Sequence, residues 1–103
     1  MSVIKINSEN FENEVVKFNG TVLADFNADW CGPCRMLAPV LEEFAEENKN
    51  VKVVSINIDE EDELADEYDV SSIPCLVVFK DGVEFERSVG FRQKEDIAEL
   101  IGE

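Results

Sequence analysis

The residues with the clearest capacity for chemistry are Cys31 and Cys34, which Gly32 and Pro33 separate in the segment DWCGPCR. An apolar strand is expected to end just before this segment and a helix to begin within it, which would place Cys31 at the helix N-terminus. Unpaired N–H groups and the positive end of the helix dipole favour a thiolate there. Pro33 suits the first helical turn, because its missing N–H is not needed at that position. The spacing therefore predicts a reactive thiol next to a second one.

The two thiols are expected to ionise differently. The helix dipole contributes up to about 2 kcal/mol, and one pKa unit corresponds to about 1.4 kcal/mol, so the pKa of Cys31 should fall toward neutrality. Cys34 lies one turn further into the helix, where burial should keep it protonated. Cys31 would attack a substrate disulfide, and Cys34 would then attack Cys31 and release the reduced product. The pair is predicted to carry electrons by cycling between dithiol and disulfide.

Asp25 is the predicted acceptor of the Cys34 proton. It interrupts the apolar segment TVLADFN, which is typical of a strand buried on both faces. A carboxylate in such a strand should have a raised pKa, which suits a general base near neutral pH. The alternative is an aspartate at a strand end that reaches water. Trp30 is expected to cover the sulfurs in part and to offer a flat apolar contact surface, unless it is an ordinary core aromatic.

A zinc site is the competing interpretation of two cysteines at this spacing. Structural zinc takes four Cys or His ligands, and the chain has three cysteines and no histidine. A carboxylate as the fourth ligand, or a cluster shared between two chains, remains open. We expect no metal and no other cofactor.

Five strands are expected to position these residues, at residues 3–6, 21–27, 51–58, 75–80 and 83–89. The last two flank Asp81-Gly82, a two-residue turn that is favoured in antiparallel hairpins. Strands separated by helices should pair in parallel through right-handed crossovers, so the hairpin is expected to add an antiparallel edge to the sheet.

Helices are expected between and after the strands. Ser8 is predicted to cap the first, which carries Phe11, Val15 and Phe18 on one face. The second follows the cysteines, with apolar residues at helical spacing and a kink at Pro39. A short acidic helix and a final amphipathic helix complete the chain. Their apolar anchors are Leu64, Ala65 and Tyr68 in the former and Ile97, Leu100 and Ile101 in the latter.

The chain of 103 residues has the length of one domain, and its 45% hydrophobic residues allow a single core. The order of elements, β-α-β-α-β-α-β-β-α, predicts an α/β fold with a mixed central sheet and helices on both faces. No linker, repeat or low-complexity segment divides the sequence, so we expect one domain over residues 1–103.

Acidic residues outnumber basic residues 24 to 9, for a net charge of −15. Such a surface repels nucleic acid and anionic lipid, so binding to either is disfavoured. The acidity indicates solvated helix faces or, alternatively, steering toward basic partners. The N-terminal segment MSVIKINSEN reaches polar residues too soon for a secretory signal, and no apolar run is long enough to span a bilayer. We therefore expect a cytoplasmic protein.

Taken together, these features give a sequence that resembles the thioredoxin family over essentially its whole length. The resemblance rests on ADFNADWCGPCRMLAP, on INIDEEDELADEYDVSSIPCLVVFKDG and on VGF. It implies the thioredoxin fold and a protein-disulfide reductase, in which Cys31 is the exposed nucleophile, Cys34 the buried resolving thiol and Asp25 the buried carboxylate. Gly32-Pro33 between the cysteines is the variant associated with reducing members of the family.

The resemblance also implies a groove for an extended substrate segment. Pro74 is expected to be a cis-proline facing the disulfide, which frees the preceding backbone to pair with the substrate. The residues expected to line the groove are Trp30, Gly32, Pro33, Ile73, Pro74, Val89 and Gly90. A thioredoxin reductase is the expected electron source. Ribonucleotide reductase, peroxiredoxins and methionine sulfoxide reductases are the expected targets, and we expect the protein to be a monomer.

Several residues depart from the family pattern. Arg35 replaces the more usual Lys and keeps the positive charge. Asn27 stands where an aromatic is common, so packing there is expected to be looser, and Phe91 is bulkier than usual and is expected to narrow the choice of partners. Ser55 stands where many members carry a Lys beside the buried Asp. Without that cation, burial should raise the pKa of the Asp further.

Cys75 is the largest departure, because Thr is usual after the cis-proline. It is either a small, partly buried apolar residue that fills this space, or a third thiol that intercepts the mixed disulfide or reacts with oxidants. Two other functions stay open at this point. One is a non-catalytic binding subunit with incidental thiols, and the other is a metal or iron–sulfur carrier that uses Cys75 as an extra ligand.

Overall fold

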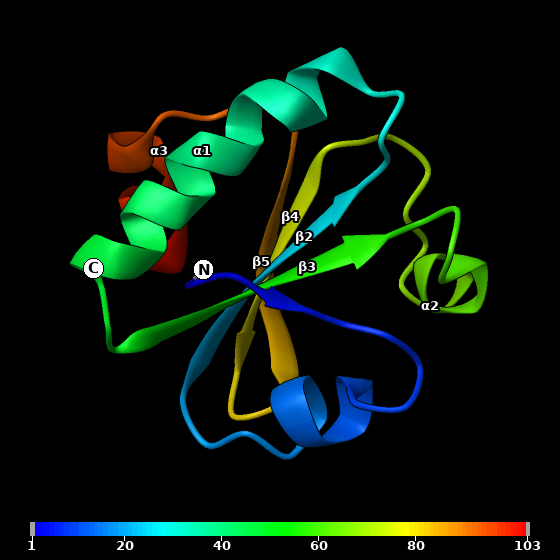
Figure 1. Ribbon diagram of the computed structural model, residues 1–103. Coiled ribbons are helices and arrows are strands. Elements are labelled where there is room, and N and C mark those ends of the chain that lie inside the picture. Colours follow the sequence, from blue (N-terminus) through cyan, green and yellow to red (C-terminus); the bar gives the residue numbers. More distant parts are fainter. Residues whose placement is uncertain (1, 103) are drawn as a thin grey trace.

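A five-stranded sheet forms the middle layer of the computed structural model, which describes residues 2–102 (Figure 1). Its strands are β1 (Ile4–Lys5), β2 (Thr21–Asn27), β3 (Val51–Asn57), β4 (Cys75–Lys80) and β5 (Val83–Val89), in the spatial order β1-β3-β2-β4-β5. The helical elements are η1 (Glu12–Val16), a short π-helix, and the α-helices α1 (Gly32–Glu47), α2 (Asp62–Glu67) and α3 (Lys94–Ile101). The predicted order of elements and the α/β class are confirmed.

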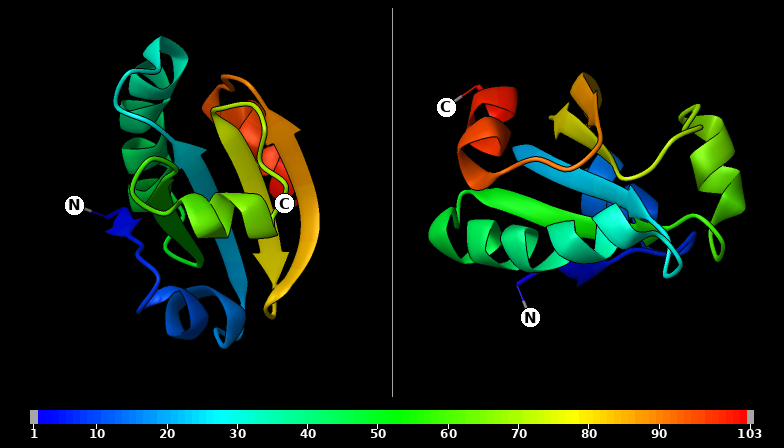
Figure 2. Two further views of the ribbon diagram at one scale, coloured as in Figure 1. Left: turned by 90° about the vertical axis from the view of Figure 1, so that its right-hand side faces the viewer. Right: turned by 90° about the horizontal axis from the view of Figure 1, so that it is seen from above.

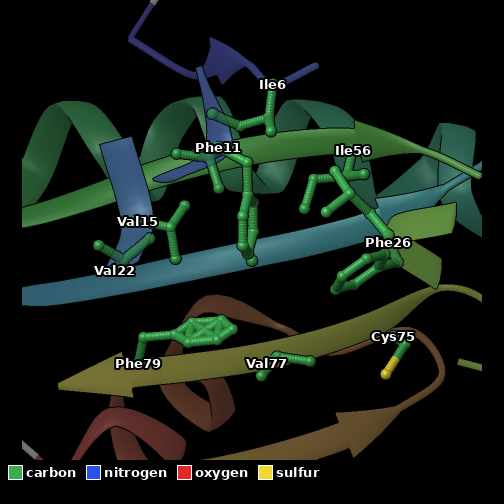
Figure 3. Packing of buried hydrophobic residues seen from close by; sticks show 12 residues of the cluster. Ile6, Phe11, Val15, Val22, Phe26, Ile56, Cys75, Val77 and Phe79 are labelled. Atoms are coloured by element: carbon green, nitrogen blue, oxygen red, sulfur yellow. The ribbon is translucent and has the colours of Figure 1, made fainter. Parts of the chain in front are cut away.

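Helices cover both faces of the sheet (Figures 1 and 2). Helices α1 and α3 pack on one face through a core that includes Leu23, Leu41, Phe44, Leu76 and Ile97. Elements η1 and α2 pack on the other face, around Phe11, Val15, Phe26, Leu64 and Phe79 (Figure 3). Successive side chains of a strand point to opposite faces, so each central strand contributes to both cores. This two-sided burial explains why β2 and β4 are apolar along almost their whole length.

Asp25 is the exception within this apolar layer. It lies in β2, two residues after Leu23, and therefore faces α1. Its neighbours in the sheet are Ser55 of β3 and Leu76 of β4. The chain passes from the end of β2 into α1 within a few residues, so the strand places Asp25 under the start of that helix.

The prediction that strands separated by helices pair in parallel is wrong for β4. It lies beside β2 and runs antiparallel to it, whereas β1 and β2 both pair with β3 in parallel. Helix α2 has six residues, which span about 9 Å, whereas the seven residues of β3 extend about 23 Å. Helix α2 is too short to return the chain to the opposite end of the sheet. Strand β4 therefore begins where β3 finishes and runs back.

The N-terminal segment differs from prediction in its cap. Phe11 and Val15 are buried, as the predicted apolar face requires, but the predicted cap at Ser8 is wrong. The side-chain oxygen of Asn7 instead accepts hydrogen bonds from the backbone N–H groups of Glu9 and Asn10, at 2.8 and 3.0 Å. Asn7 therefore organises the turn that precedes η1, because a short amide side chain reaches N–H groups two and three residues ahead.

The predicted hairpin between β4 and β5 is confirmed. Asp81 and Gly82 have φ values of 52° and 83°, which is the left-handed pair that a two-residue turn of this type requires. Helix α1 contains Pro39 and continues past it to Glu47. Within residues 2–102, no helix combines the length and the apolar character needed to cross a bilayer.

Candidate active site

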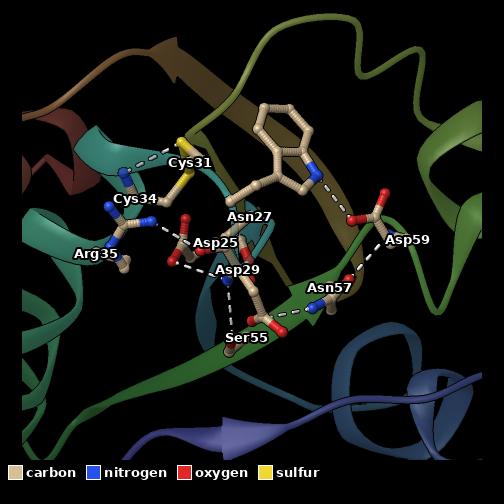
Figure 4. Close-up of a disulfide and its surroundings, with 10 residues drawn as sticks. Asp25, Asn27, Asp29, Cys31, Cys34, Arg35, Ser55, Asn57 and Asp59 are labelled. Atoms are coloured by element: carbon tan, nitrogen blue, oxygen red, sulfur yellow. Dashed lines mark hydrogen bonds between the residues drawn. A yellow bond between two sulfur atoms is a disulfide. The ribbon is translucent and has the colours of Figure 1, made fainter.

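Cys31 and Cys34 form a disulfide at the start of α1, with their Cα atoms 5.2 Å apart (Figure 4). Cys31 is the N-cap residue, and its Sγ accepts a hydrogen bond from the backbone N–H of Cys34 at 3.2 Å. Gly32 and Pro33 occupy the first helical positions, where the missing N–H of proline leaves no helical hydrogen bond unmade. The prediction that a sulfur stands at a helix N-terminus and accepts its free N–H groups is confirmed.

The expected contrast in exposure between the two cysteines is wrong for the disulfide form. Cys31 is 5% exposed and Cys34 is 4% exposed. Both pack with Ala28, and Ile58 and Ile73 lie against them. The bond between the sulfurs holds Cys31 Sγ against the helix start, so the nucleophile predicted to be exposed is covered in this state.

Asp25 lies behind this pair with 3% of its side chain exposed, which does not fit an aspartate that simply reaches water. Burial raises its pKa from an ordinary value of 3.8 to about 6, and a hydrogen bond from Asn27 opposes the rise. This is the direction predicted for a carboxylate with no lysine beside it. A carboxyl group with this pKa exchanges its proton near neutral pH.

Asn27 and Ser55 are site residues whose contacts were not foreseen. The Asn27 Nδ2 group donates to Asp25 Oδ2 at 3.1 Å and to Ser55 Oγ at 2.8 Å (Figure 4). In the sequence, Asn27 was notable only because an aromatic residue is common at its position, and Ser55 only because a lysine is common at its position. The available signal was the spacing in β2, because residues 25 and 27 of one strand share a face. The partnership with Ser55 depends on strand register, which the sequence does not state.

A cleft of about 630 Å³ opens beside Asp25 between α1 and the β1–β3 side of the sheet. Its polar lining includes Asp25, Asn27 and Ser55 from the sheet, together with Cys34 and Arg35 from α1. Asp25 and Cys34 therefore line the same cleft.

Trp30 is 67% exposed, so it is not a core aromatic. Its Nε1 group donates a hydrogen bond to Asp59 Oδ2 at 2.8 Å, and the backbone N–H of Asp59 donates to Asn57 Oδ1 at the same distance (Figure 4). Asp59 is a residue near the site that the sequence analysis did not name. The contact ties the indole to Asp59 and leaves most of its surface in solvent.

The peptide bond between Ile73 and Pro74 is cis, as the resemblance implied. The side chain of Ile73 packs against the cysteine pair, and the carbonyl oxygen of Pro74 accepts a hydrogen bond from the N–H of Gly90 at 2.8 Å. Val89 and Phe91, on either side of that glycine, are exposed. The segment before β4 and the end of β5 are thus joined by this hydrogen bond, and Ile73 contacts the cysteine pair.

Cys75 is buried on the opposite face of the sheet from Asp25 (Figure 3). It packs in the core that contains Phe26 and Val77, and burial raises the pKa of its thiol. This environment is that of a small apolar core residue. A role as an accessory thiol stays a prediction. Within residues 2–102 no group of three or more His, Cys, Asp and Glu side chains is arranged to hold a metal.

Comparisons with known proteins agree with this geometry. The family model for thioredoxin matches residues 2–103. Thioredoxin from Chlamydia pneumoniae is 52% identical over 96 residues, covering 93% of this chain and 92% of the relative. Thioredoxin from Bacillus subtilis is 49% identical over 102 residues, covering 98% and 96%.

A solved structure of a mutant thioredoxin from Halobacterium salinarum matches with a TM-score of 0.89 and 40% identity. The match covers 97% of this chain and 88% of that one. The similarity extends over nearly the whole chain, so it includes both the fold and the segment with the cysteine pair. The chain belongs to the thioredoxin family and is a thiol–disulfide oxidoreductase.

Proposed function

We propose that the chain reduces disulfides in other proteins, with Cys31 as the nucleophile, Cys34 as the resolving thiol and Asp25 as the general base. The observation that carries this proposal is the hydrogen bond from the Cys34 N–H to Cys31 Sγ at the start of α1. The same N–H stabilises a thiolate at Cys31 once the disulfide is reduced. A non-catalytic binding subunit does not need this arrangement.

In the first step, the Cys31 thiolate attacks one sulfur of the substrate disulfide. The substrate S–S bond breaks, a mixed disulfide forms between Cys31 and the substrate, and the other substrate sulfur leaves as a thiolate that takes a proton from water. The attack needs Cys31 to be ionised at neutral pH, and the helix N-terminus stabilises that thiolate without a metal or a histidine.

In the second step, the Cys34 thiol gives its proton to the Asp25 carboxylate, and the resulting thiolate attacks Cys31 Sγ. The mixed disulfide breaks, the Cys31–Cys34 bond forms, and the second substrate thiolate is released and protonated. The substrate has then gained two electrons and two protons. Asp25 suits this step because its pKa of about 6 keeps it ionised at neutral pH.

The substrate segment is proposed to lie in an extended conformation beside the cis-proline. The residues proposed to contact it are Trp30, Gly32, Pro33, Ile73, Pro74, Val89 and Gly90. The apolar side chains of the non-glycine residues among them would exclude water from the exchanging sulfurs, and backbone groups next to Pro74 would pair with the substrate.

Family membership implies a thioredoxin reductase and disulfide-bearing proteins as partners in general. We further propose ribonucleotide reductase, peroxiredoxins and methionine sulfoxide reductases as targets, and a cytoplasmic, monomeric, single-domain protein that binds neither nucleic acid nor membranes. The excess of acidic residues supports the last two exclusions.

Reduction of a protein disulfide, with dithiothreitol or a thioredoxin reductase as electron source, tests the assignment. Cys31→Ser is expected to abolish turnover. Cys34→Ser is expected to perform the first step only and to accumulate a mixed disulfide that mass spectrometry detects. Cys75→Ser is the matched control and should turn over like the parent. Turnover that survives in Cys31→Ser would falsify the assigned nucleophile.

A further inference from the structure

Three polar side chains meet on the α1-facing side of β2 and β3, in a layer that is otherwise apolar. Asp25 and Asn27 are two residues apart on β2, and Ser55 is the register partner of Asp25 on β3. Asp25 is buried, and the other two are partly buried. This cluster lies under the N-terminal turns of α1, where Cys34 also lines the cleft.

The amide of Asn27 links the cluster. Its two N–H bonds face three acceptors: the backbone oxygen of Asp25 at 3.1 Å, Asp25 Oδ2 at 3.1 Å and Ser55 Oγ at 2.8 Å. The amide is thus held from both strands at once. It has little freedom to turn away from the carboxylate.

The two oxygens of the Asp25 carboxylate have different surroundings. Oδ2 accepts from Asn27, whereas Oδ1 is buried and has no hydrogen-bond partner among residues 2–102. Figure 4 shows the oxygen that Asn27 does not bond on the side of the carboxylate that faces the disulfide. A buried oxygen without a partner costs free energy, and a functional role such as accepting a proton is one reason for a protein to keep it.

We propose that Asn27 is a positioning residue for the second step, in which Cys34 attacks Cys31 and the substrate thiol is released. It fixes one oxygen of the Asp25 carboxylate and leaves the other turned toward Cys34, and Ser55 holds the amide of Asn27 in that orientation. This inference rests on the proposed role of Asp25 as the base that accepts the Cys34 proton. Asn27 acts through Asp25 and does not contact the exchanging sulfurs.

The other charged residues that line the cleft are Lys5 of β1, Asp29 after β2, and Arg35 and Glu42 of α1. Cys34 of α1, which is disulfide-bonded in this structure, also lines the cleft, and Cys75 of β4 interacts electrostatically with Asp25. Leu76, the neighbour of Asp25 on β4, adds no charge. None of these groups changes when Asn27 is replaced, so the effect of the amide can be measured against a constant background.

A donor that bonds to a carboxylate favours its charged form. Loss of the Asn27 donor is therefore expected to raise the titration midpoint of Asp25 by about one pH unit, which is the size of one charged hydrogen bond in a cleft open to water. From a midpoint of about 6, this lowers the ionised fraction roughly fivefold at pH 6 and hardly at all at pH 8. The variant should therefore release the substrate thiol more slowly than the parent at pH 6 and at nearly the same rate at pH 8.

The first measurement is an NMR titration of the Asp25 carboxyl carbon in the oxidised protein. Asn27→Leu is compared with Asn57→Leu, a matched control from the register partner on β3. Asn57 lines the same cleft, but its amide donates to Asp29 and not to Asp25. The midpoint is expected to rise in Asn27→Leu and to stay unchanged in Asn57→Leu. An unchanged midpoint in Asn27→Leu, or an equal rise in both, overturns the proposal.

The second measurement is the release of thionitrobenzoate when the reduced protein reacts with Ellman's reagent. The first equivalent reports attack by Cys31, and the second reports release by Cys34. In Asn27→Leu the second phase should slow about fivefold at pH 6 and match the parent at pH 8, with the first phase unchanged. In an Asp25→Asn background, Asn27→Leu should add no pH-dependent effect.

The two proposals fail in different ways. If the midpoint moves as expected but Asp25→Asn leaves the pH profile of release unaltered, the assignment of Asp25 as base is wrong while Asn27 still tunes it. If Asp25→Asn slows release but Asn27→Leu leaves the midpoint in place, the positioning role alone is wrong. If Asn27→Leu does not fold, Ser55→Ala is measured instead. A rise of less than one pH unit in the titration midpoint of Asp25 supports the proposal, and an unchanged midpoint overturns it.

Discussion

Asp25 and Cys75 are two buried titratable groups on opposite faces of the same sheet, in strands two positions apart in the chain order. Burial raises the pKa of both. For the carboxyl group, the rise brings the pKa to about 6 and thus closer to physiological pH. For the thiol, the same physical effect moves the pKa further from it. Desolvation therefore brings the pKa of Asp25 closer to neutral pH and makes ionisation of the Cys75 thiol less favourable there.

The surroundings of the two groups reinforce this difference. Asp25 has a hydrogen-bond donor in Asn27 and lies on a cleft that Cys34 shares. Cys75 packs among apolar residues such as Phe26 and Val77. Burial alone therefore does not identify a functional group. The direction in which burial shifts the pKa, and the space next to the group, distinguish the two sites.

Replacing Asp25 by Asn should have the largest effect on activity, because it removes the buried carboxylate that distinguishes this site from Cys75. Release of the second substrate thiol is expected to slow on the order of a hundredfold at pH 7, because the general base is lost and water replaces it only in part. Stopped-flow measurement of the second thionitrobenzoate equivalent checks this. A rate equal to that of the parent across pH 6–8 would contradict a role for Asp25 in release.

Asp25→Asn should also change how stability depends on pH. The folded-state pKa lies above the ordinary value, so protonated Asp25 favours the folded state below about pH 3.8, and this contribution is lost as the pH rises through about 6. The difference of about two pKa units corresponds to about 3 kcal/mol. Urea unfolding of the oxidised variant should show a gain of up to this size at pH 8 and none at pH 3.5. An equal gain at both pH values would mean that ionisation is not its cause.

Cys75→Ser tests the buried group on the other face of the sheet, and it should affect stability but not activity. A hydroxyl group in this apolar core is expected to lower the free energy of unfolding by about 1–3 kcal/mol, with disulfide reduction unchanged. Urea unfolding measures the first effect and turnover the second. Disulfide mapping of the oxidised parent by mass spectrometry completes the test. A bond from Cys75 to Cys31 or Cys34 would show that this thiol is within reach of the pair after all.

Asp59→Ala should have the smallest effect, because it removes only a hydrogen bond to Trp30, one of the residues proposed to contact the substrate. Without its hydrogen bond the Trp30 indole is less ordered in the free protein, and ordering it on binding costs about 0.5 kcal/mol or more. We expect KM for a protein disulfide to rise about twofold with kcat unchanged. Steady-state kinetics separate the two constants, and a fall in kcat would place Asp59 in the exchange chemistry.

The local elements were predictable because their signals are local. The apolar run Thr21–Asn27, the turn at Asp81-Gly82 and the helix start at Cys31 each depend on residues within a few positions of one another. The redox chemistry followed from the same local pattern, since two cysteines three positions apart at a helix start have their sulfurs close together whatever the rest of the chain does.

The direction of β4 and the partners of Asp25 were not predictable in this way. Strand β4 runs antiparallel to β2 because α2 is too short to carry the chain back across the sheet, which is a property of three elements together. The bond from Asn27 to Ser55 joins residues 28 positions apart, and that from Trp30 to Asp59 joins residues 29 positions apart. Each depends on the register between strands or on where a loop passes.

Local sequence patterns were enough to predict the disulfide chemistry, the central apolar strands and the carboxylate among them. The folded arrangement was needed to show which oxygen of that carboxylate accepts from Asn27, which faces the disulfide, and that Cys75 lies on the opposite face of the sheet. The physical reason is that propensity and periodicity act between near neighbours along the chain. A pKa and a hydrogen bond are instead set by whichever atoms folding brings within a few ångströms.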